Sequence, residues 1–171
     1  YVLQKPSPDD RAAIESAATR MDRIVGDLLT LASVDDDLAV PPEIVDLRAL
    51  VEEVYEETRV CATQHTLEVG ALDGAHVLGH HERLRELLVN LTGNALKYTP
   101  DGGRITLALR REGERARLSV SDTGIGIPHE DQSRIFDRFY RVDKARSRAR
   151  GGTGLGLAIV KAIAVSHHGS V

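Results

Sequence analysis

Residues 7–36 carry the pattern that most restricts the fold of this chain. Apolar side chains recur there at intervals of 3, 4, 3, 4 and 3 residues, at Ile14, Ala17, Met21, Ile24, Leu28 and Leu31. Such spacing predicts one helix with an a/d seam, which Ser7 and Pro8 would begin as N-cap and first helical residue. The helix either faces its own domain or forms one strand of a helical bundle. Because Pro41-Pro42 separates it from the rest, and no equivalent antiparallel helix follows, we expect it to pair with a second copy or with upstream sequence.

Composition excludes several classes of protein. The chain has 171 residues, of which 42% are hydrophobic, and this is enough for the core of one full domain. Its net charge of −4 gives no basic field, so we predict no nucleic-acid partner. A single cysteine, Cys61, excludes an internal disulfide and fits a reducing compartment. The longest apolar stretch, 155–165, is interrupted by Lys161 and is shorter than the roughly 20 residues of a membrane-spanning helix.

From residue 44 onward, helical and strand patterns alternate. Apolar helices are expected at 80–98 and 154–168, and Asp46 is placed to cap another helix over 47–63. Period-two alternation predicts strands at 44–47, 67–70, 76–78, 105–109 and 116–120, with a hairpin at 111–114. Residues 128–152 are polar and irregular. The pattern predicts an α+β fold, with helices on one face of a mixed, mostly antiparallel sheet.

Asp122 continues the inward phase of the strand at 116–120, which directs its carboxylate toward the core side. Burial of an ionised carboxylate costs several kcal/mol unless hydrogen-bond donors meet it. Gly124 and Gly126 follow directly, where the backbone can approach a ligand closely. Two interpretations stay open: Asp122 caps the following turn, or it accepts a hydrogen bond from the amino group of a planar ligand.

Asn90 and Asn94 lie one turn apart on the same face of helix 80–98, which is otherwise rich in leucine. Their carboxamide oxygens could hold a hydrated cation such as Mg²⁺, with phosphate oxygens completing the octahedron. Lys97 and Tyr98 would add a cation and an aromatic ring beside the same place. The alternative is that both amides hydrogen-bond the neighbouring sheet.

The sequence GGTGLG, residues 151–156, opens the last helix. Free N–H groups and the positive end of a helix form an anion site. No βαβ unit precedes this run and no Lys-Ser/Thr follows it, so it is neither a dinucleotide fingerprint nor a P-loop.

A basic segment at 134–150 precedes the glycine run, with seven Lys or Arg against two Asp. Both phenylalanines and Tyr140 fall within 136–140. A solvated loop is the usual explanation of such a charge run. Beside two candidate phosphate-binding elements, we favour a lid over a polyphosphate, anchored by its aromatic rings.

Taken together, these segments resemble bacterial sensor histidine kinases of two-component systems. The N, first glycine, phenylalanine and second glycine boxes of that family look like LLVNLTGNALKYTP (87–100), SDTGIGIP (121–128), IFDRFYR (135–141) and GGTGLGLAIVK (151–161). RMDRIVGDLLTLASVD (20–35) is similar to the second helix of their dimerisation and phosphotransfer hairpin. The resemblance implies a partial hairpin at 1–40 and a catalytic ATP-binding domain at 41–171. It also implies the two-layer α/β sandwich shared with gyrase-type ATPases, which we expect to be incomplete at its C-terminal edge.

The resemblance also implies roles for the matching residues. ATP is the implied nucleotide, and Asn90 and Asn94 would hold Mg²⁺ and the triphosphate. Lys97 would contact phosphate, Tyr98 would stack near adenine, and Asp122 would accept from the adenine amino group. The residues implied to shape the pocket or to approach the phosphates are Gly124, Gly126, Arg138, Gly152, Thr153, Gly154, Leu155 and Gly156.

The phosphoacceptor motif of the family is absent. His81-Glu82-Arg83 imitates its start, but no Thr-Pro follows, and we expect His80 and His81 to be ordinary helix-start residues. No residue is therefore given a catalytic role, and the γ-phosphoryl group of ATP would pass to a histidine outside this chain. The implied partners are a second copy, as a homodimer through 7–36, and a response regulator receiver domain. The implied location is the cytoplasm, with anchoring of the parent protein in the inner membrane left open.

Two other functions stay open at this point. A hydrolysing ATPase of the gyrase type would use a glutamate four residues before the metal-binding asparagine. Asn90 stands there and Glu86 is a further turn away, which favours kinase chemistry. The other alternative is a non-catalytic nucleotide-binding module that only dimerises through 7–36.

Overall fold

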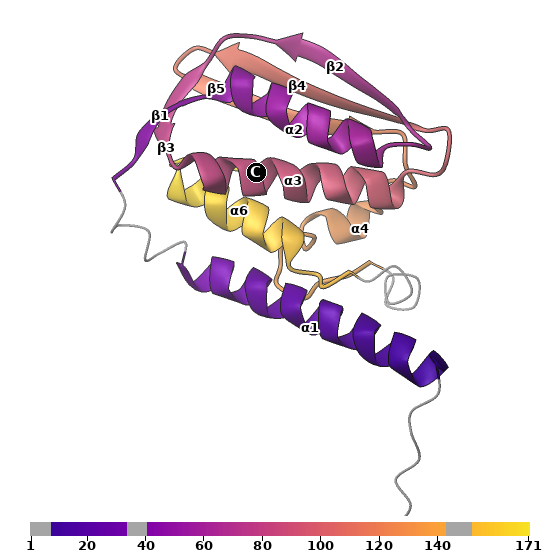
Figure 1. Ribbon diagram of the computed structural model, residues 1–171. Helices are drawn as coiled ribbons and strands as arrows, with labels where there is room; N and C mark the ends of the chain where they lie inside the picture. The colour runs from indigo at the N-terminus through magenta and orange to yellow at the C-terminus, as the bar shows by residue number, and fades with distance from the viewer. Residues whose placement is uncertain (1–7, 34–40, 143–151) are drawn as a thin grey trace, which may run out of the picture.

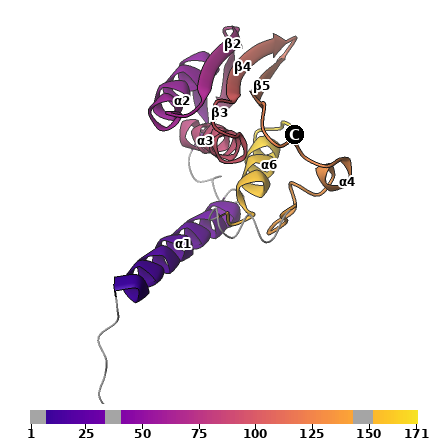
Figure 2. The same cartoon turned by 90° about the vertical axis from the view of Figure 1, so that its right-hand side faces the viewer.

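The computed structural model describes residues 8–33, 41–142 and 152–171. Strands form one layer and helices cover one of its faces, while the first helix, α1 (Pro8–Ser33), extends away from both (Figure 1, Figure 2). This arrangement confirms the predicted α+β fold. The predicted N-cap Ser7, the acidic exit at 35–37 and Gly151 lie outside the described residues.

The strands pair in both senses, as predicted. Their bounds are β1 (Glu43–Asp46), β2 (Thr66–Leu72), β3 (His76–Gly79), β4 (Arg104–Glu112) and β5 (Arg115–Asp122). In the described residues, β1 pairs antiparallel with β3, while β2, β4 and β5 form a second sheet in that order. β2 runs parallel to β4, and β5 runs antiparallel to it. Gly113 makes the hairpin between β4 and β5 with a φ of 66°, a backbone conformation that favours glycine.

The helices have bounds close to those predicted, and one short helix was not predicted. They are α2 (Leu47–Cys61), α3 (His81–Tyr98), α4 (His129–Gln132) and α6 (Gly156–Ser166). Oδ1 of Asp46 accepts hydrogen bonds from the backbone N–H groups of Arg48 (2.9 Å) and Ala49 (3.3 Å). The predicted cap is therefore confirmed, and it turns the chain from β1 directly into α2.

The core between the two layers is aliphatic. Its fully buried side chains come from α2, α3, β4 and the last helical segment, and include Leu50, Val54, Leu88, Ile105, Leu107, Leu109, Leu155, Ile159 and Ile163. Burial of each such side chain stabilises the fold by about 1.5–3 kcal/mol. This packing fixes α3 and α6 side by side, and both helices carry segments of the predicted site.

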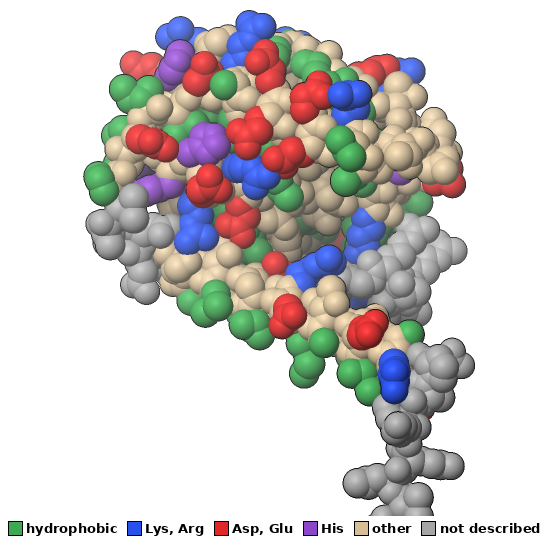
Figure 3. Space-filling model, in the orientation of Figure 1, with side chains coloured by type: hydrophobic (Ala, Val, Ile, Leu, Met, Phe, Trp, Pro, Cys, Tyr) green, Lys and Arg blue, Asp and Glu red, His purple; other side chains and the backbone are tan. Residues whose placement is uncertain are grey.

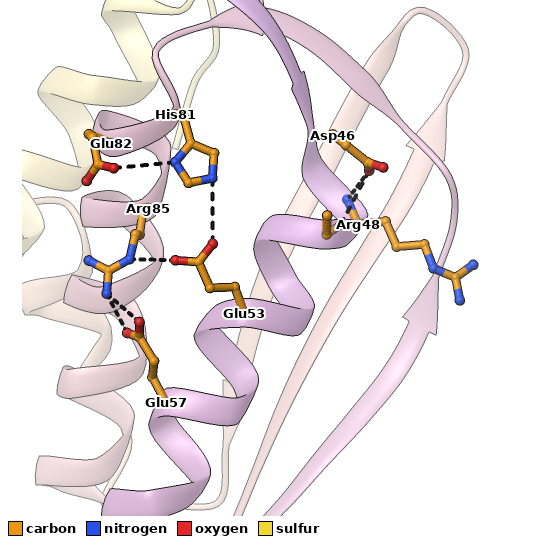
Figure 4. Close-up of polar contacts among 8 residues, drawn as sticks. Asp46, Arg48, Glu53, Glu57, His81, Glu82 and Arg85 are labelled. Atoms are coloured by element: carbon orange, nitrogen blue, oxygen red, sulfur yellow. Dashed lines mark hydrogen bonds and ion pairs between the residues drawn. The ribbon is translucent and has the colours of Figure 1, made fainter.

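An ion-pair network on the surface joins α2 to α3 (Figure 4). Arg85 of α3 contacts two carboxylates of α2, with Nε 2.9 Å from Glu53 Oε1 and Nη2 2.6 Å from Glu57 Oε1. His81 lies 3.6 Å from Glu53 and from Glu82. The two carboxylates raise the pKa of Arg85, mainly through the hydrogen bonds that Arg85 donates to Glu57 and then to Glu53. His81 thus serves as a surface residue at the start of α3, in agreement with the prediction.

The predicted seam of α1 is buried in the core at one end and exposed to solvent toward the other. Leu31 is 5% exposed and belongs to the core, and Ile24 packs against it. Ile14 and Met21, on the same predicted seam, are 60% and 67% exposed. The last turns of α1 therefore dock on their own chain, and the predicted pairing with a second copy or with upstream sequence stays a prediction.

Polar contacts explain this docking. Thr30 Oγ1 donates a hydrogen bond to Glu86 Oε1 (2.9 Å), and Arg83 Nη2 donates one to Ser33 Oγ (2.6 Å). These pairs join residues more than 45 apart in the sequence, so helical spacing alone could not reveal them.

In the described part of the chain, no helix is both long enough and apolar enough to cross a membrane.

Candidate functional site

The side chain of Asn90 is fixed on α3 with its oxygen toward the start of α6. Its Nδ2 donates a hydrogen bond to the Glu86 carbonyl oxygen (3.0 Å). A Cβ atom at Gly156 would stand 2.7 Å from Asn90 Oδ1, so glycine lets α6 begin this close to α3. Asn94 is half-buried, and its amide makes no hydrogen bond with the described residues. Neither amide bonds a described strand, which contradicts that alternative.

The end of α3 meets the turn that follows β5. The carbonyl oxygen of Tyr98 accepts a hydrogen bond from the Ile125 N–H (3.2 Å). A Cβ atom at Gly124 would lie 2.6 Å from that same oxygen, so the two backbones touch only because residue 124 is glycine. Lys97 Nζ lies 5.1 Å from the centroid of the Tyr98 ring, a cation–π distance. A cation, an aromatic ring and a glycine turn thus lie together at the end of α3.

Asp122 departs from the prediction of burial. Its strand phase is right, because Val120 packs on the core, but Asp122 itself is exposed at the end of β5. Its Oδ1 accepts a hydrogen bond from the Gly124 N–H (2.8 Å), which confirms the turn-capping interpretation. Oδ2 bonds no other described residue, so one carboxylate oxygen stays open to a ligand. Gly126 completes this turn with a φ of 70°.

The aromatic segment is joined to the glycine-rich segment through the backbone. The Phe139 N–H donates to the Gly154 carbonyl oxygen (2.9 Å), and both residues have positive φ, 62° and 75°. The Tyr140 hydroxyl donates to the Asp131 carboxylate, and the Arg134 guanidinium lies 4.3 Å from the Tyr140 ring centroid. The hydrogen bond to Asp131, followed by burial, raises the pKa of Tyr140.

Two arginines of this segment differ in their surroundings. Arg138, the predicted one, is exposed and lines a cavity of about 320 Å³ with Leu31, Phe136 and Lys161, between α1 and α6. Arg141 was not singled out from the sequence, although it belongs to the basic run. Its Nε and Nη2 are buried and have no hydrogen-bond partner among the described residues. Buried guanidinium donors are normally paired, so this residue is equipped to receive an anion.

The glycine-rich segment is tied at Thr153. Its Oγ1 donates a hydrogen bond to Asp27 Oδ2 of α1 (2.8 Å) and accepts one from the Leu155 N–H (3.2 Å). Gly152 is half-buried beside it, and the Leu155 side chain is fully buried in the core. Leu155 can therefore meet a ligand only through its backbone.

The donors available suit a hard cation bound together with phosphate. The described residues hold no group of three or more His, Cys, Asp or Glu that could bind a metal by itself. Asn90 Oδ1 and the Asn94 amide instead offer neutral oxygens one helical turn apart. Mg²⁺ accepts such partial protein coordination when substrate phosphates and water supply the remaining oxygens. The residues present thus fit magnesium.

The part of the chain that carries these site residues matches a known protein family. Residues 79–171 match the family described as histidine kinase-, DNA gyrase B- and HSP90-like ATPase. The chain is 41% identical over 155 residues to the sensor-like histidine kinase SenX3 of Mycolicibacterium smegmatis, covering 89% of this chain. It spans 40% of the length of that relative.

Two solved structures share the fold. The mycobacterial sensor histidine kinase MprB is 31% identical with a TM-score of 0.65, covering 74% of this chain and 80% of that one. Full-length ShkA in complex with AMPPNP is 28% identical with a TM-score of 0.72, covering 95% of this chain and 35% of that one. Both the arm and the sandwich thus have counterparts in ShkA.

Proposed function

Because this chain belongs to the histidine kinase-, DNA gyrase B- and HSP90-like ATPase family, as the catalytic region of a sensor histidine kinase, we propose that it binds ATP as its Mg²⁺ complex. It would transfer the γ-phosphoryl group to a histidine that this chain does not supply. One observation supports this most strongly: Gly156 leaves room for Asn90 Oδ1 at the start of α6. A phosphate bound there would meet helix-start N–H groups and the asparagine face together.

The nucleotide would lie between α3, the turn after β5 and the glycine-rich segment. Asp122 would accept a hydrogen bond from the adenine amino group through Oδ2, the oxygen that does not cap the turn. Tyr98 would stack near the adenine ring. Lys97 and Arg141 would contact phosphates, and the exposed Arg138 would reach them only from the lid. The backbone of the remaining predicted residues would wrap the ligand, at Gly124, Gly126, Gly152, Thr153, Gly154, Leu155 and Gly156.

Asn90 and Asn94 would hold Mg²⁺, which neutralises phosphate charge when bound. The hydrogen bond from Asn90 Nδ2 to the Glu86 carbonyl favours this, since it leaves Oδ1, which faces the start of α6, as the ligating atom. The protein's own contribution would be to orient the triphosphate and to exclude water from it.

Hydrolysis is the competing activity, and Glu86 argues against it. Both carboxylate oxygens of Glu86 are engaged, Oε1 by Thr30 and Oε2 by Arg83 (3.2 Å). A carboxylate occupied by two donors is a poor general base for water, and Asn90 cannot act as a base at all. Phosphoryl transfer to an imidazole needs no such base, because a neutral histidine is itself nucleophilic.

The exposed side of α1 supports a second copy as partner. Its apolar residues combine three positions of the predicted seam with two beside it in a 4, 3, 4, 3 spacing, at Ile14, Ala18, Met21, Val25 and Leu28. Apolar side chains are visible along this arm in Figure 3. We propose a homodimer through this stripe, and a response regulator receiver domain as the acceptor of the phosphoryl group. We place the region in the cytoplasm, where ATP is available.

A transfer assay tests the proposal. A separate two-helix hairpin that carries a phosphoacceptor histidine is mixed with this chain, Mg²⁺ and radiolabelled ATP. Label on the hairpin, and none on a hairpin with that histidine changed to Gln, is the expected result. Clear ATP binding without transfer would contradict the kinase proposal, and rapid multiple-turnover release of phosphate would favour the hydrolase.

A further inference from the structure

One hydrogen bond connects the arm directly to the candidate phosphate-binding segment. Thr153 Oγ1 and Asp27 Oδ2 are 2.8 Å apart, although the two residues are separated by 126 positions. The hydroxyl of Thr153 also accepts from the Leu155 N–H, immediately before α6. A hydroxyl has a single proton, so its orientation is set by Asp27.

Neighbouring contacts place Asp27 firmly against this segment. Leu31, one turn further along α1, is buried in the core, and Thr30 is bonded to Glu86 of α3. Asp27 itself is half-buried. The arm is therefore held on α3 and α6 by several contacts, and Asp27 is the contact that reaches the glycine-rich segment.

This contact is unfavourable for a polyphosphate in two ways. The Thr153 proton cannot be donated to a phosphate oxygen while it is donated to Asp27. In addition, the Asp27 carboxylate adds negative charge next to helix-start N–H groups that would otherwise attract only the ligand. Both effects act only while the arm is docked.

We propose that Asp27 is a positioning residue that couples the arm to the nucleotide site, so that docking of the arm and binding of nucleotide oppose each other. This inference rests on the proposed nucleotide binding. Coupling of this kind is reciprocal: if the docked arm weakens binding, bound nucleotide must release the arm by the same factor.

Calorimetric titration with Mg-ATP measures the first half of the coupling. Asp27→Ala is expected to tighten binding by about three- to tenfold, within the range of the net contribution of one ordinary hydrogen bond in a protein. Asp27→Asn keeps an acceptor oxygen and should tighten it less. Asp22→Ala is the matched control, since Asp22 is an exposed carboxylate on the same helix. Unchanged or weaker binding by Asp27→Ala, relative to Asp22→Ala, overturns the coupling.

Distances between spin labels measure the second half of the coupling, which is the release of the arm by bound nucleotide, independently of affinity. Cys61 is the single cysteine and is exposed on α2, and Ser16→Cys supplies a second site on α1. Mg-ATP should move or broaden the distance between the labels, and Asp27→Ala should do so without nucleotide. Distances that change in neither case overturn the inference. Failure of every variant to bind Mg-ATP contradicts the proposed function itself, whereas binding without any effect of Asp27 contradicts only the coupling.

Discussion

The carbonyl oxygen of Tyr98 accepts a hydrogen bond from the Ile125 N–H at 3.2 Å, which joins the end of α3 to the turn after β5. Gly124 permits this contact, since a Cβ atom there would stand 2.6 Å from the same oxygen. Backbone atoms cannot yield as a flexible side chain can. The contact therefore depends on the absence of a side chain at residue 124.

We predict that Gly124→Ala lowers the free energy of unfolding by about 1–3 kcal/mol, the usual cost of forcing extra atoms into a packed place. ATP affinity should fall with it, because Asp122 caps this turn. The control is Gly74→Ala, since a Cβ atom at Gly74 meets nothing within 4 Å. Urea denaturation of Gly124→Ala and Gly74→Ala measures the change in the free energy of unfolding. Equal stability of the two variants would contradict the predicted backbone contact.

Local sequence signals predicted most of the fold. Asp46 was recognisable as a cap, and the periodicity of the helices and strands follows from side chains that face the aliphatic core. What the sequence could not give was contact between distant segments. The docking of α1 depends on Thr30 meeting Glu86, and no local pattern encodes that pair.

The candidate site shows the same division. The sequence pointed to Asn90, Tyr98 and Gly124 as site residues. In the fold, Gly124 lies against the backbone of Tyr98, and Asn90 lies against Gly156 of the glycine-rich segment. For Asp122 the turn cap was foreseen but burial was wrongly expected, because strand phase indicates a face and not how far that face is covered at its end. The sequence did not point to Arg141, whose two buried nitrogens, without a hydrogen-bond partner in the described part of the chain, appear only in three dimensions. Phe136, expected to help anchor the lid, lines the cavity beside Leu31.

The link between α2 and α3 should be measurable as a coupling energy. We predict about 0.3–1 kcal/mol for the Arg85–Glu57 pair from a double-mutant cycle of Arg85→Ala and Glu57→Ala, since exposed and partly exposed pairs fall in this range. The Arg48–Glu52 pair, whose side chains are 54% and 53% exposed, should give less. The Arg85 coupling should decrease in about 1 M salt. A coupling energy of zero, or one that does not change with salt, would contradict the predicted contribution of this ion pair.

Tyr140 should give the protein a distinct response to alkaline pH. Its pKa is raised above 10.0 in the folded state, chiefly by the hydrogen bond to Asp131. The stability from this bond is therefore present below pH about 10 and is lost as pH rises through the folded value. In an absorbance titration of the four tyrosines, Tyr140→Phe should remove a late step, and Asp131→Asn should shift it to lower pH. Glu130→Gln is the control and should leave it in place.

The apolar stripe of α1 should govern self-association. We predict that Met21→Glu weakens the dimer about tenfold or more in sedimentation equilibrium, because a carboxylate would enter an apolar seam. Ser16→Glu adds the same charge to an exposed position away from the stripe and should have little effect. Identical association of the two variants would exclude this stripe as the interface.

Calorimetric titration of the chain with ATP, with and without Mg²⁺, tests the central claim most directly. The wild-type chain should bind one Mg-ATP, more tightly than ATP alone. Asn94→Ala should lose about tenfold or more of the Mg-ATP affinity and most of the magnesium dependence, as expected for the loss of an oxygen that holds the metal. Val89→Ala, at a half-exposed position on the same helix, is the control. Equal affinity with and without magnesium, or in wild type and Asn94→Ala, would contradict the account.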